Sequence, residues 1–138
     1  MTSSAPPPES ALRVASVQMN PEIGQTERNV ARSLDFIAQA AAGGAGLVVL
    51  PELCNTGYVF ETREEAMALA EPIPDGPSCR RWREAAAKHR MVIVAGITER
   101  DGDVLYNSAV VVGPQGVLGT YRKNHLWGAE NLFFERGN

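Results

Sequence analysis

The stretch Leu47-Val-Val-Leu-Pro-Glu-Leu-Cys-Asn-Thr-Gly-Tyr58 places a carboxylate directly after a short apolar run. Residues 47–50 are all apolar and partly β-branched, which is typical of a strand buried on both faces of a parallel sheet. Pro51 has no N–H for a sheet ladder, so the strand is predicted to end there. Ligands of open α/β sheets bind beyond the carboxyl ends of the strands. Glu52 is therefore a candidate site residue, and a solvated strand-end acid is the alternative.

The segment before this stretch predicts a strand followed by a helix. Residues 12–19 alternate loosely and predict the first strand. Residues 26–41 carry apolar side chains at helical spacing, with Thr26 as the expected cap and Gly43-Gly44 as the expected end. Strand, helix and strand in close succession form a βαβ unit, so we expect the strands at 12–19 and 47–50 to be parallel.

The segment after this stretch predicts two more helices and an antiparallel meander. The expected elements are a helix from a Thr62 cap to about Ala70, a helix over 79–89 capped by Ser78, and strands over 91–98, 104–112 and 117–122. Asp101-Gly102 has the composition of a hairpin turn. Residues 123–138 show neither strand nor helix periodicity and are interpreted as a loop.

These elements predict an α/β fold in which a mixed sheet carries helices on its outer face. Strands that are apolar on both sides need cover on both sides. The other face of this sheet has no predicted cover, which indicates a partial domain. We expect that uncovered face to include Val48, Val49, Val92, Val94, Ala109 and Val111.

Composition restricts the classes of function. The chain has 138 residues, 44% of them hydrophobic, and a net charge of -3 without a basic stripe, which disfavours nucleic acid as a partner. No run approaches the roughly 18 apolar residues that a membrane span needs. Residues 1–10 are rich in Pro and Ser and predict a disordered tail, which leaves 11–138 as the domain. Cys54 and Cys79 match neither a disulfide framework nor a zinc site, so we expect no metal and a reducing, cytoplasmic setting.

A second group of candidate residues follows the last predicted strand. Lys123 lies at the strand end and Glu130 lies seven residues further on. A carboxylate beside a positioned ammonium forms an acid/base pair that can serve nucleophilic catalysis. Neighbouring aromatic side chains would desolvate the ammonium and lower its pKa, and a solvated lysine is the alternative. The candidates for a substrate pocket are Tyr58, Phe60, His125 and Trp127.

Three motifs, in this order, resemble the signatures of the carbon–nitrogen hydrolase (nitrilase) superfamily. They are Pro51-Glu-Leu53 with Thr56-Gly-Tyr58, then Leu105-Tyr-Asn-Ser-Ala-Val110, then Gly116-Val-Leu-Gly-Thr-Tyr-Arg-Lys-Asn-His-Leu126. The resemblance covers 12–138. It implies a four-layer α-β-β-α sandwich, of which this chain would form the amino-terminal part. It also implies hydrolysis of small nitrile, amide or N-carbamoyl substrates without a cofactor.

The same resemblance implies roles for individual residues. Glu52 matches the family's general base, Lys123 its oxyanion stabiliser and Glu130 a supporting acid. The family's nucleophilic Cys lies a few tens of residues after the Lys, at a position this chain does not reach. Neither Cys54 nor Cys79 matches it, although Cys79 lies near a predicted helix start beside two arginines, where a thiol pKa can be lowered.

Two functions remain open from the sequence. The first is the amino-terminal part of a thiol-dependent hydrolase that is inactive alone and needs the missing carboxyl-terminal half. The second is a non-catalytic truncated chain, or a half that pairs with a separate chain carrying the Cys. The family resemblance also implies homo-oligomers. A nucleotide-binding module is disfavoured, because no Gly-rich phosphate loop follows residues 12–19 or 47–50.

Overall fold

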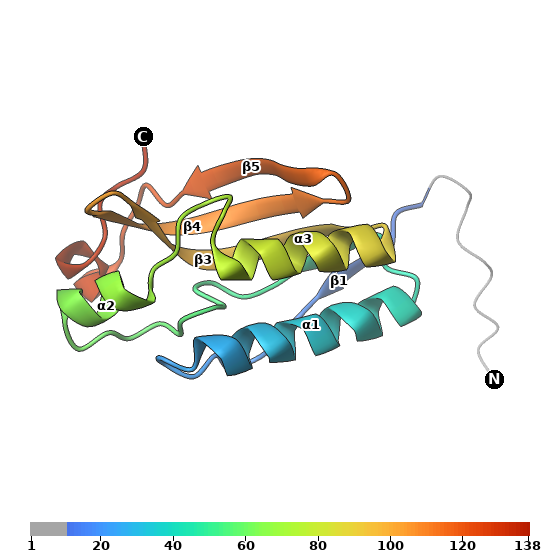
Figure 1. The fold of residues 1–138 in the computed structure, drawn as a ribbon, viewed down its shortest axis with the longest axis horizontal. Coiled ribbons are helices and arrows are strands. Elements are labelled where there is room, and N and C mark those ends of the chain that lie inside the picture. The colour runs from blue at the N-terminus through green and yellow to red at the C-terminus, as the bar shows by residue number, and fades with distance from the viewer. Residues whose placement is uncertain (1–10) are drawn as a thin grey trace.

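The computed structural model describes residues 11–138, and the expected disordered tail at 1–10 lies outside the described residues. One sheet carries the longer helices α1 and α3 side by side on the same face (Figure 1). The strands are β1 (Val14–Ser16), β2 (Leu47–Val49), β3 (Val92–Asp101), β4 (Val104–Gly113) and β5 (Gly116–Arg122). The helices are α1 (Thr26–Ala42), α2 (Arg63–Leu69), α3 (Pro77–His89) and the 3-10 helix η1 (Gly128–Leu132).

The five-stranded sheet is mixed, as predicted. Its strand order is β1-β2-β3-β4-β5. The pairs β1–β2 and β2–β3 are parallel, whereas β3–β4 and β4–β5 are antiparallel. Asp101 pairs with Val104, so Gly102 and Asp103 form the hairpin loop, and Gly102 has the positive φ of +60° that such a turn requires. The expected α/β fold, with helices on one face of a mixed sheet, is confirmed. No helix described in 11–138 is long and apolar enough to cross a membrane.

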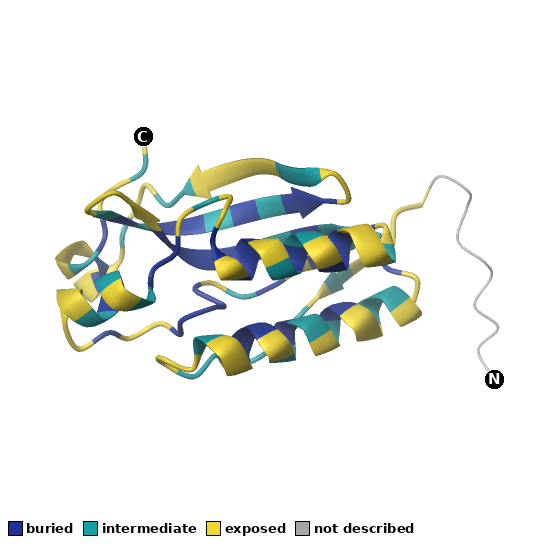
Figure 2. Ribbon diagram, in the orientation of Figure 1, coloured by how far each residue is buried: buried dark blue, intermediate teal, exposed yellow. Residues whose placement is uncertain are grey.

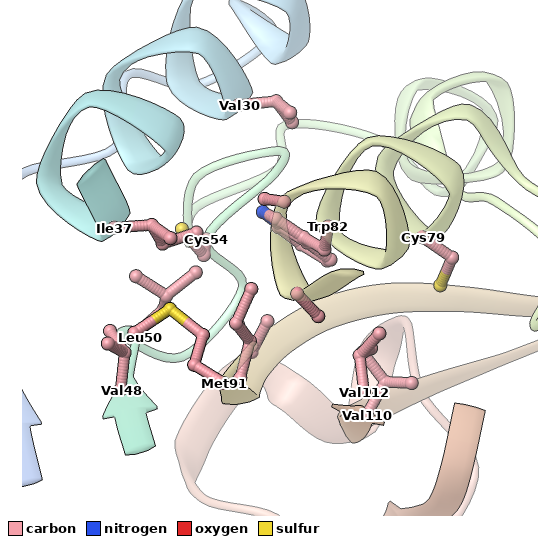
Figure 3. Close-up of a cluster of buried hydrophobic side chains, with 14 of the residues drawn as sticks. Val30, Ile37, Val48, Leu50, Cys54, Cys79, Trp82, Met91, Val110 and Val112 are labelled. Atoms are coloured by element: carbon pink, nitrogen blue, oxygen red, sulfur yellow. The ribbon is translucent and has the colours of Figure 1, made fainter. Parts of the chain in front are cut away.

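The main core lies between the sheet and the two longer helices. Figure 3 shows Ile37 of α1, Trp82 of α3 and Val48 of β2 among its fully buried side chains. The indole Nε1–H of Trp82 donates a hydrogen bond of 2.9 Å to Ser33 Oγ. A buried indole N–H needs a partner, so this bond couples α3 to α1 inside the apolar layer.

Two helix starts differ from the sequence prediction. Gln25, rather than Thr26, precedes the first turn of α1, and its carbonyl accepts the Asn29 N–H at 2.8 Å. Helix α3 begins at Pro77, because proline suits the first helical turn, where no N–H partner is needed. Ser78 does not cap α3 but donates its N–H and its hydroxyl to the buried Glu71 carboxylate.

The start of α2 agrees with the prediction, whereas the first strand is shorter than predicted. Thr62 caps α2 as expected, because its Oγ1 accepts the Glu65 N–H at 3.1 Å. The first strand covers only Val14–Ser16 of the expected 12–19. Among the described residues, β1 is an edge strand that pairs with β2, and β2 offers three residues for pairing. The length of β1 is therefore limited by the partner residues that β2 provides, and not by the apolar pattern of residues 12–19.

The segment 123–138 is more structured than the loop that was predicted. It contains η1, and Phe134 lies buried in a second apolar cluster with Phe60 and Leu105. Arg63 of α2 donates to the Phe133 carbonyl at 3.0 Å. Figure 1 accordingly shows η1 next to α2 at one end of the sheet. Tertiary contacts with α2 and β4 therefore order a segment that has no local periodicity.

Within residues 11–138, no helix covers the face of the sheet opposite α1 and α3 (Figure 1). Figure 2 shows that α1 and α3 turn their exposed residues away from the sheet. On the open face, Val14 is 55% exposed, Val49 37% and Tyr121 61%. The expectation that Val48 belongs to this face was wrong. Val48 is fully buried under the helices, because successive residues of a strand point to opposite faces.

We predict that the 138-residue chain associates through this open face and binds hydrophobic dyes, because contiguous exposed apolar surface is rare on soluble monomers. Val49→Lys should reduce association and dye binding while the cooperative melt persists. The matched change Val48→Lys should abolish the fold, because it buries an unpaired ammonium. Sedimentation velocity, dye fluorescence and thermal melts measure these effects. A wild-type chain that is monomeric at micromolar concentration and binds no dye would contradict the prediction.

Candidate active site

Glu52 lies in the turn that follows β2, where the chain passes very close to β3. The Leu50 N–H donates to the Val94 carbonyl at 2.8 Å, and the Cys54 N–H donates to the Gly96 carbonyl at 2.9 Å. A Cβ on Gly96 would stand 2.6 Å from the Glu52 Cα. This contact is too close for any side chain, so glycine at position 96 allows the turn to rest directly on β3.

A buried polar network holds the turn that carries Glu52. The Asn55 amide donates to Glu71 Oε2 at 2.8 Å, and its Oδ1 accepts the Thr98 N–H at 3.1 Å. The Asn29 side chain of α1 donates to the Asn55 carbonyl at 3.0 Å. Asn29, Asn55 and Thr98 are fully buried. Sequence reasoning assigned these residues no role in the site, because their partners are distant in the chain.

Lys123 follows β5 and is held at both its backbone groups. Its N–H donates to the Asn107 carbonyl at 2.8 Å, and its carbonyl accepts the Gly137 N–H at 3.0 Å. The preceding Arg122 donates to the buried Glu99 carboxylate, with 2.6 Å between Nη2 and Oε1. The Arg122 guanidinium also lies 3.8 Å from the centre of the Tyr106 ring. The end of β5, and with it Lys123, is thus anchored to β3 and β4.

The predicted convergence of Glu52, Lys123 and Glu130 is confirmed. Lys123 Nζ lies 2.8 Å from Glu52 Oε1, a residue 71 positions away in the chain. The same ammonium lies 3.1 Å from Glu130 Oε1 and 3.0 Å from Glu130 Oε2. One ammonium therefore lies between two carboxylates.

Asn107 of β4 joins this group, although sequence reasoning gave it no role. Its Nδ2 donates hydrogen bonds of 2.7 Å to Glu52 Oε1 and 2.7 Å to Glu130 Oε1. In the sequence, Asn107 lies within the motif 105–110. Its place in a strand pattern gives no sign that its side chain meets two carboxylates from elsewhere in the chain.

In the cluster formed by Glu52, Asn107, Lys123 and Glu130, the surroundings favour the charged forms of Lys123 and Glu130. Burial alone would raise the pKa of Glu130, but hydrogen bonds from the Trp127 N–H, Lys123 and Asn107 outweigh it and leave that pKa below its ordinary value. Burial would likewise lower the pKa of Lys123, but its bonds to Glu52 and Glu130 raise it overall. The expected lowering by aromatic neighbours was wrong, because the two carboxylates dominate. Lys123 is therefore a fixed positive charge at neutral pH and not a base.

A pocket of about 470 Å³ opens at this cluster on the uncovered face of the sheet. Val49, Val94, Ala109 and Tyr121 form part of its apolar floor, and Glu52, Asn107, Lys123 and His125 contribute its polar lining. The Glu52 side chain is 43% exposed, whereas that of Glu130 is only 4% exposed. The Glu52 carboxylate is therefore accessible from the pocket, whereas the Glu130 carboxylate is shielded from solvent.

The four predicted pocket residues have different places in the structure. His125 lines the pocket. Tyr58 is 39% exposed, and partial burial together with the carboxylates of Glu130 and Glu52 raises the pKa of its phenol. Phe60 instead packs in the second apolar cluster against Phe133, with ring centres 5.8 Å apart. Trp127 is 73% exposed, and it meets Glu130 through its backbone, with its N–H donating to Glu130 Oε2 at 2.6 Å.

Neither cysteine is placed to act as a nucleophile. Cys54 and Cys79 are fully buried, and burial raises the pKa of each thiol to about 12. The alternative of a reactive Cys79 is therefore wrong, because burial and the Glu71 carboxylate outweigh the neighbouring arginine. Across residues 11–138, no group of three or more His, Cys, Asp or Glu side chains is arranged to hold a metal ion.

The sequence profile of the carbon-nitrogen hydrolase family matches residues 13–138. The chain belongs to this family. A nitrilase from Pyrococcus abyssi is 51% identical over 127 residues, a match that covers 92% of this chain and 48% of the relative. An (R)-stereoselective amidase from Pseudomonas sp is 32% identical over 127 residues, covering 92% and 45% of the two chains.

Solved structures of the same family share the fold. A crystal structure of an N-terminal amidase superposes on this carbon-nitrogen hydrolase chain with a TM-score of 0.81 at 30% identity, covering 91% of this chain and 31% of the other. The chain spans about half the length, or less, of these relatives.

We predict that Gly96→Ala disturbs the Glu52 turn. Its Cβ would press on the backbone of residues 51–53, so the variant should lose about 1–3 kcal/mol of folding free energy. Denaturant unfolding measures the loss, and a crystal structure of the variant would show the Glu52–Lys123 pair lengthened. Gly119→Ala is the matched control in the same sheet, because a Cβ there meets nothing within 4 Å. Equal stability of the two variants would contradict the close-approach argument.

The lowered pKa of Glu130 predicts how the free energy of unfolding depends on pH. The folded-state pKa of Glu130 lies below its unfolded value. The ionised Glu130 carboxylate therefore stabilises the fold fully above the unfolded pKa, and this stabilisation is lost as the pH falls through the folded pKa. Glu130→Gln should therefore destabilise the chain at pH 7, and its deficit relative to wild type should shrink between roughly pH 5 and pH 3. Unfolding free energies at each pH measure this. The exposed Glu64→Gln should show no such change, and a pH-independent deficit for Glu130→Gln would contradict the prediction.

Proposed function

We propose that this chain supplies two members of a Glu-Lys-Cys set in a hydrolase acting on nitrile, amide or N-carbamoyl carbon–nitrogen bonds. The observation that carries the proposal is the Lys123 ammonium, bonded to both Glu52 and Glu130 at the mouth of an apolar pocket. The names of the relatives, a nitrilase and an amidase, support the same class of reaction. The scheme needs a small-molecule substrate and no cofactor.

In this proposal Glu52 is the general base. Its half-exposed carboxylate takes the proton of a cysteine thiol, and the thiolate attacks the substrate carbon. For an amide, the same proton is then given to the leaving nitrogen, which departs as ammonia and leaves a thioester. Water hydrolyses the thioester, with Glu52 accepting its proton, and the thiol is restored.

Lys123 would stabilise the negative charge that develops on the substrate in each tetrahedral step. Its raised pKa suits this electrostatic role, because the group stays protonated throughout. Glu130 is buried behind Lys123 and orients the ammonium through bonds to both of its carboxylate oxygens. A charge that is already held in place stabilises the transition state more than one that has to reorient during the reaction.

The nucleophile in this scheme comes from outside residues 1–138, since both cysteines present are buried. It would lie on the same polypeptide or on a separate chain seated on the open face of the sheet. We therefore expect the 138-residue chain alone to be inactive. Homo-oligomers of the complete domain remain part of the proposal.

The test joins this chain to the remaining part of the Pyrococcus abyssi nitrilase, the relative that is 51% identical. We predict that the joined protein releases ammonia from a panel of nitriles, amides and carbamoyl amino acids. Glu52→Gln and Lys123→Met should each lower turnover by roughly three orders of magnitude or more, because removing one member of a catalytic set typically does so. The exposed Glu64→Gln should keep the activity.

The chain of 138 residues alone is the second arm of this test. Turnover by that chain, abolished by Cys54→Ala or Cys79→Ala, would show that the nucleophile is misassigned. An inactive joined protein that is nevertheless folded would count against the proposed hydrolase function.

A further inference from the structure

Asn107 is bonded to every charged member of the cluster. Its side-chain Nδ2 donates to Glu52 Oε1 and to Glu130 Oε1, each at 2.7 Å. Its backbone carbonyl accepts the Lys123 N–H at 2.8 Å. Asn107 is only 4% exposed and pairs with Thr98 in the β3–β4 ladder, so its position is fixed by the sheet and not by a loop.

These bonds determine which carboxylate oxygens are available for a proton. A primary amide has two hydrogens on its nitrogen, and here each one points to a different carboxylate. Glu52 Oε1 accepts from Asn107 and also from Lys123 at 2.8 Å, so both of its lone pairs are used. Within residues 11–138, no hydrogen bond reaches Glu52 Oε2. The Glu52 side chain as a whole is 43% exposed.

We propose that Asn107 is a positioning residue that occupies Oε1 of both carboxylates, so that Glu52 takes up the reaction proton at Oε2. This inference rests on the proposed function, because that function defines the reaction in which Glu52 takes up a proton. The placement of the amide between the carboxylates is independent of it.

The chemistry of position 107 suits a neutral double donor. A second cation there would neutralise the pair and weaken Glu52 as a base. A carboxylic acid would either repel both carboxylates or share a proton with one of them. An apolar side chain would leave two carboxylate oxygens facing each other with Lys123 as their only donor. The amide donates to both carboxylates without adding charge.

The first experiment measures titration in the 138-residue chain and needs no turnover. Carbon-detected NMR would follow the Glu130 carboxyl in wild type and in Asn107→Leu, which keeps the approximate size and removes both donors. We expect the pKa of Glu130 to rise in this variant, because one of the bonds that lower it is lost. The exposed Asn20→Leu is the matched control and should leave the titration unchanged.

Asn107→Asp keeps the shape of the side chain and provides a second variant if Asn107→Leu does not fold. It places a third carboxylate against Glu52 and Glu130, so the cluster should bind one additional proton at neutral pH. The matched control Asn20→Asp should titrate as an ordinary exposed aspartate. A residue that only fills space would alter the melting temperature in these variants without this change in proton binding.

The second experiment measures kinetics in the joined protein. With Asn107→Leu, kcat should fall about tenfold to a hundredfold while KM changes little, because the base is misplaced and the apolar floor is intact. The acid limb of the kcat/KM profile should move to higher pH. Wild-type kinetics together with wild-type Glu130 titration would overturn the inference. An inactive joined protein with the expected titration shifts would contradict the proposed function and support the placement of Asn107 between the carboxylates.

Discussion

The site depends on holding one ammonium against two carboxylates at the rim of an apolar sheet. Lys123 lies within 3.1 Å of oxygens of both Glu52 and Glu130. Charges taken out of water are costly unless each is paired and hydrogen-bonded, and here the buried Glu130 has donors on both of its oxygens. The cost of desolvation is offset only while all the partners stay in place, so the surrounding backbone has to be rigid.

That rigidity comes from close backbone contacts around the cluster. Gly96 lets β3 lie directly beneath the Glu52 turn, and buried Asn55 secures the turn with side-chain bonds. Lys123 is held by backbone bonds to Asn107 and Gly137. Glu52 and Lys123 lie just after strands β2 and β5 and Glu130 lies in η1, while Gly96 and Asn107, which help to position them, belong to β3 and β4. A preorganised site of this kind does not need to reorder when charge develops on a substrate.

The open face of the sheet links the fold to the proposed chemistry. The pocket lies on that face, next to exposed Val49 and Tyr121, and its polar residues gather beyond the carboxyl end of β2. Whatever covers the apolar floor would also enclose the Lys123 cluster and remove water from it. Exclusion of water strengthens the interaction of a fixed ammonium with a developing oxyanion. Folding and catalysis would thus need the same covering surface.

The sequence by itself determined the order of strands and helices, the parallel start of the sheet and the candidates Glu52, Lys123 and Glu130. Those features follow from local apolar periodicity and from ordered motifs, which are readable along the chain. Only the tertiary structure decided that Asn107 joins the two carboxylates, that Phe60 is a core residue and that Cys79 is inert. It also ordered residues 128–132 into η1. The physical reason is that hydrogen-bond partners, burial and pKa depend on residues far apart in the chain, and local sequence patterns carry no information about which of them meet.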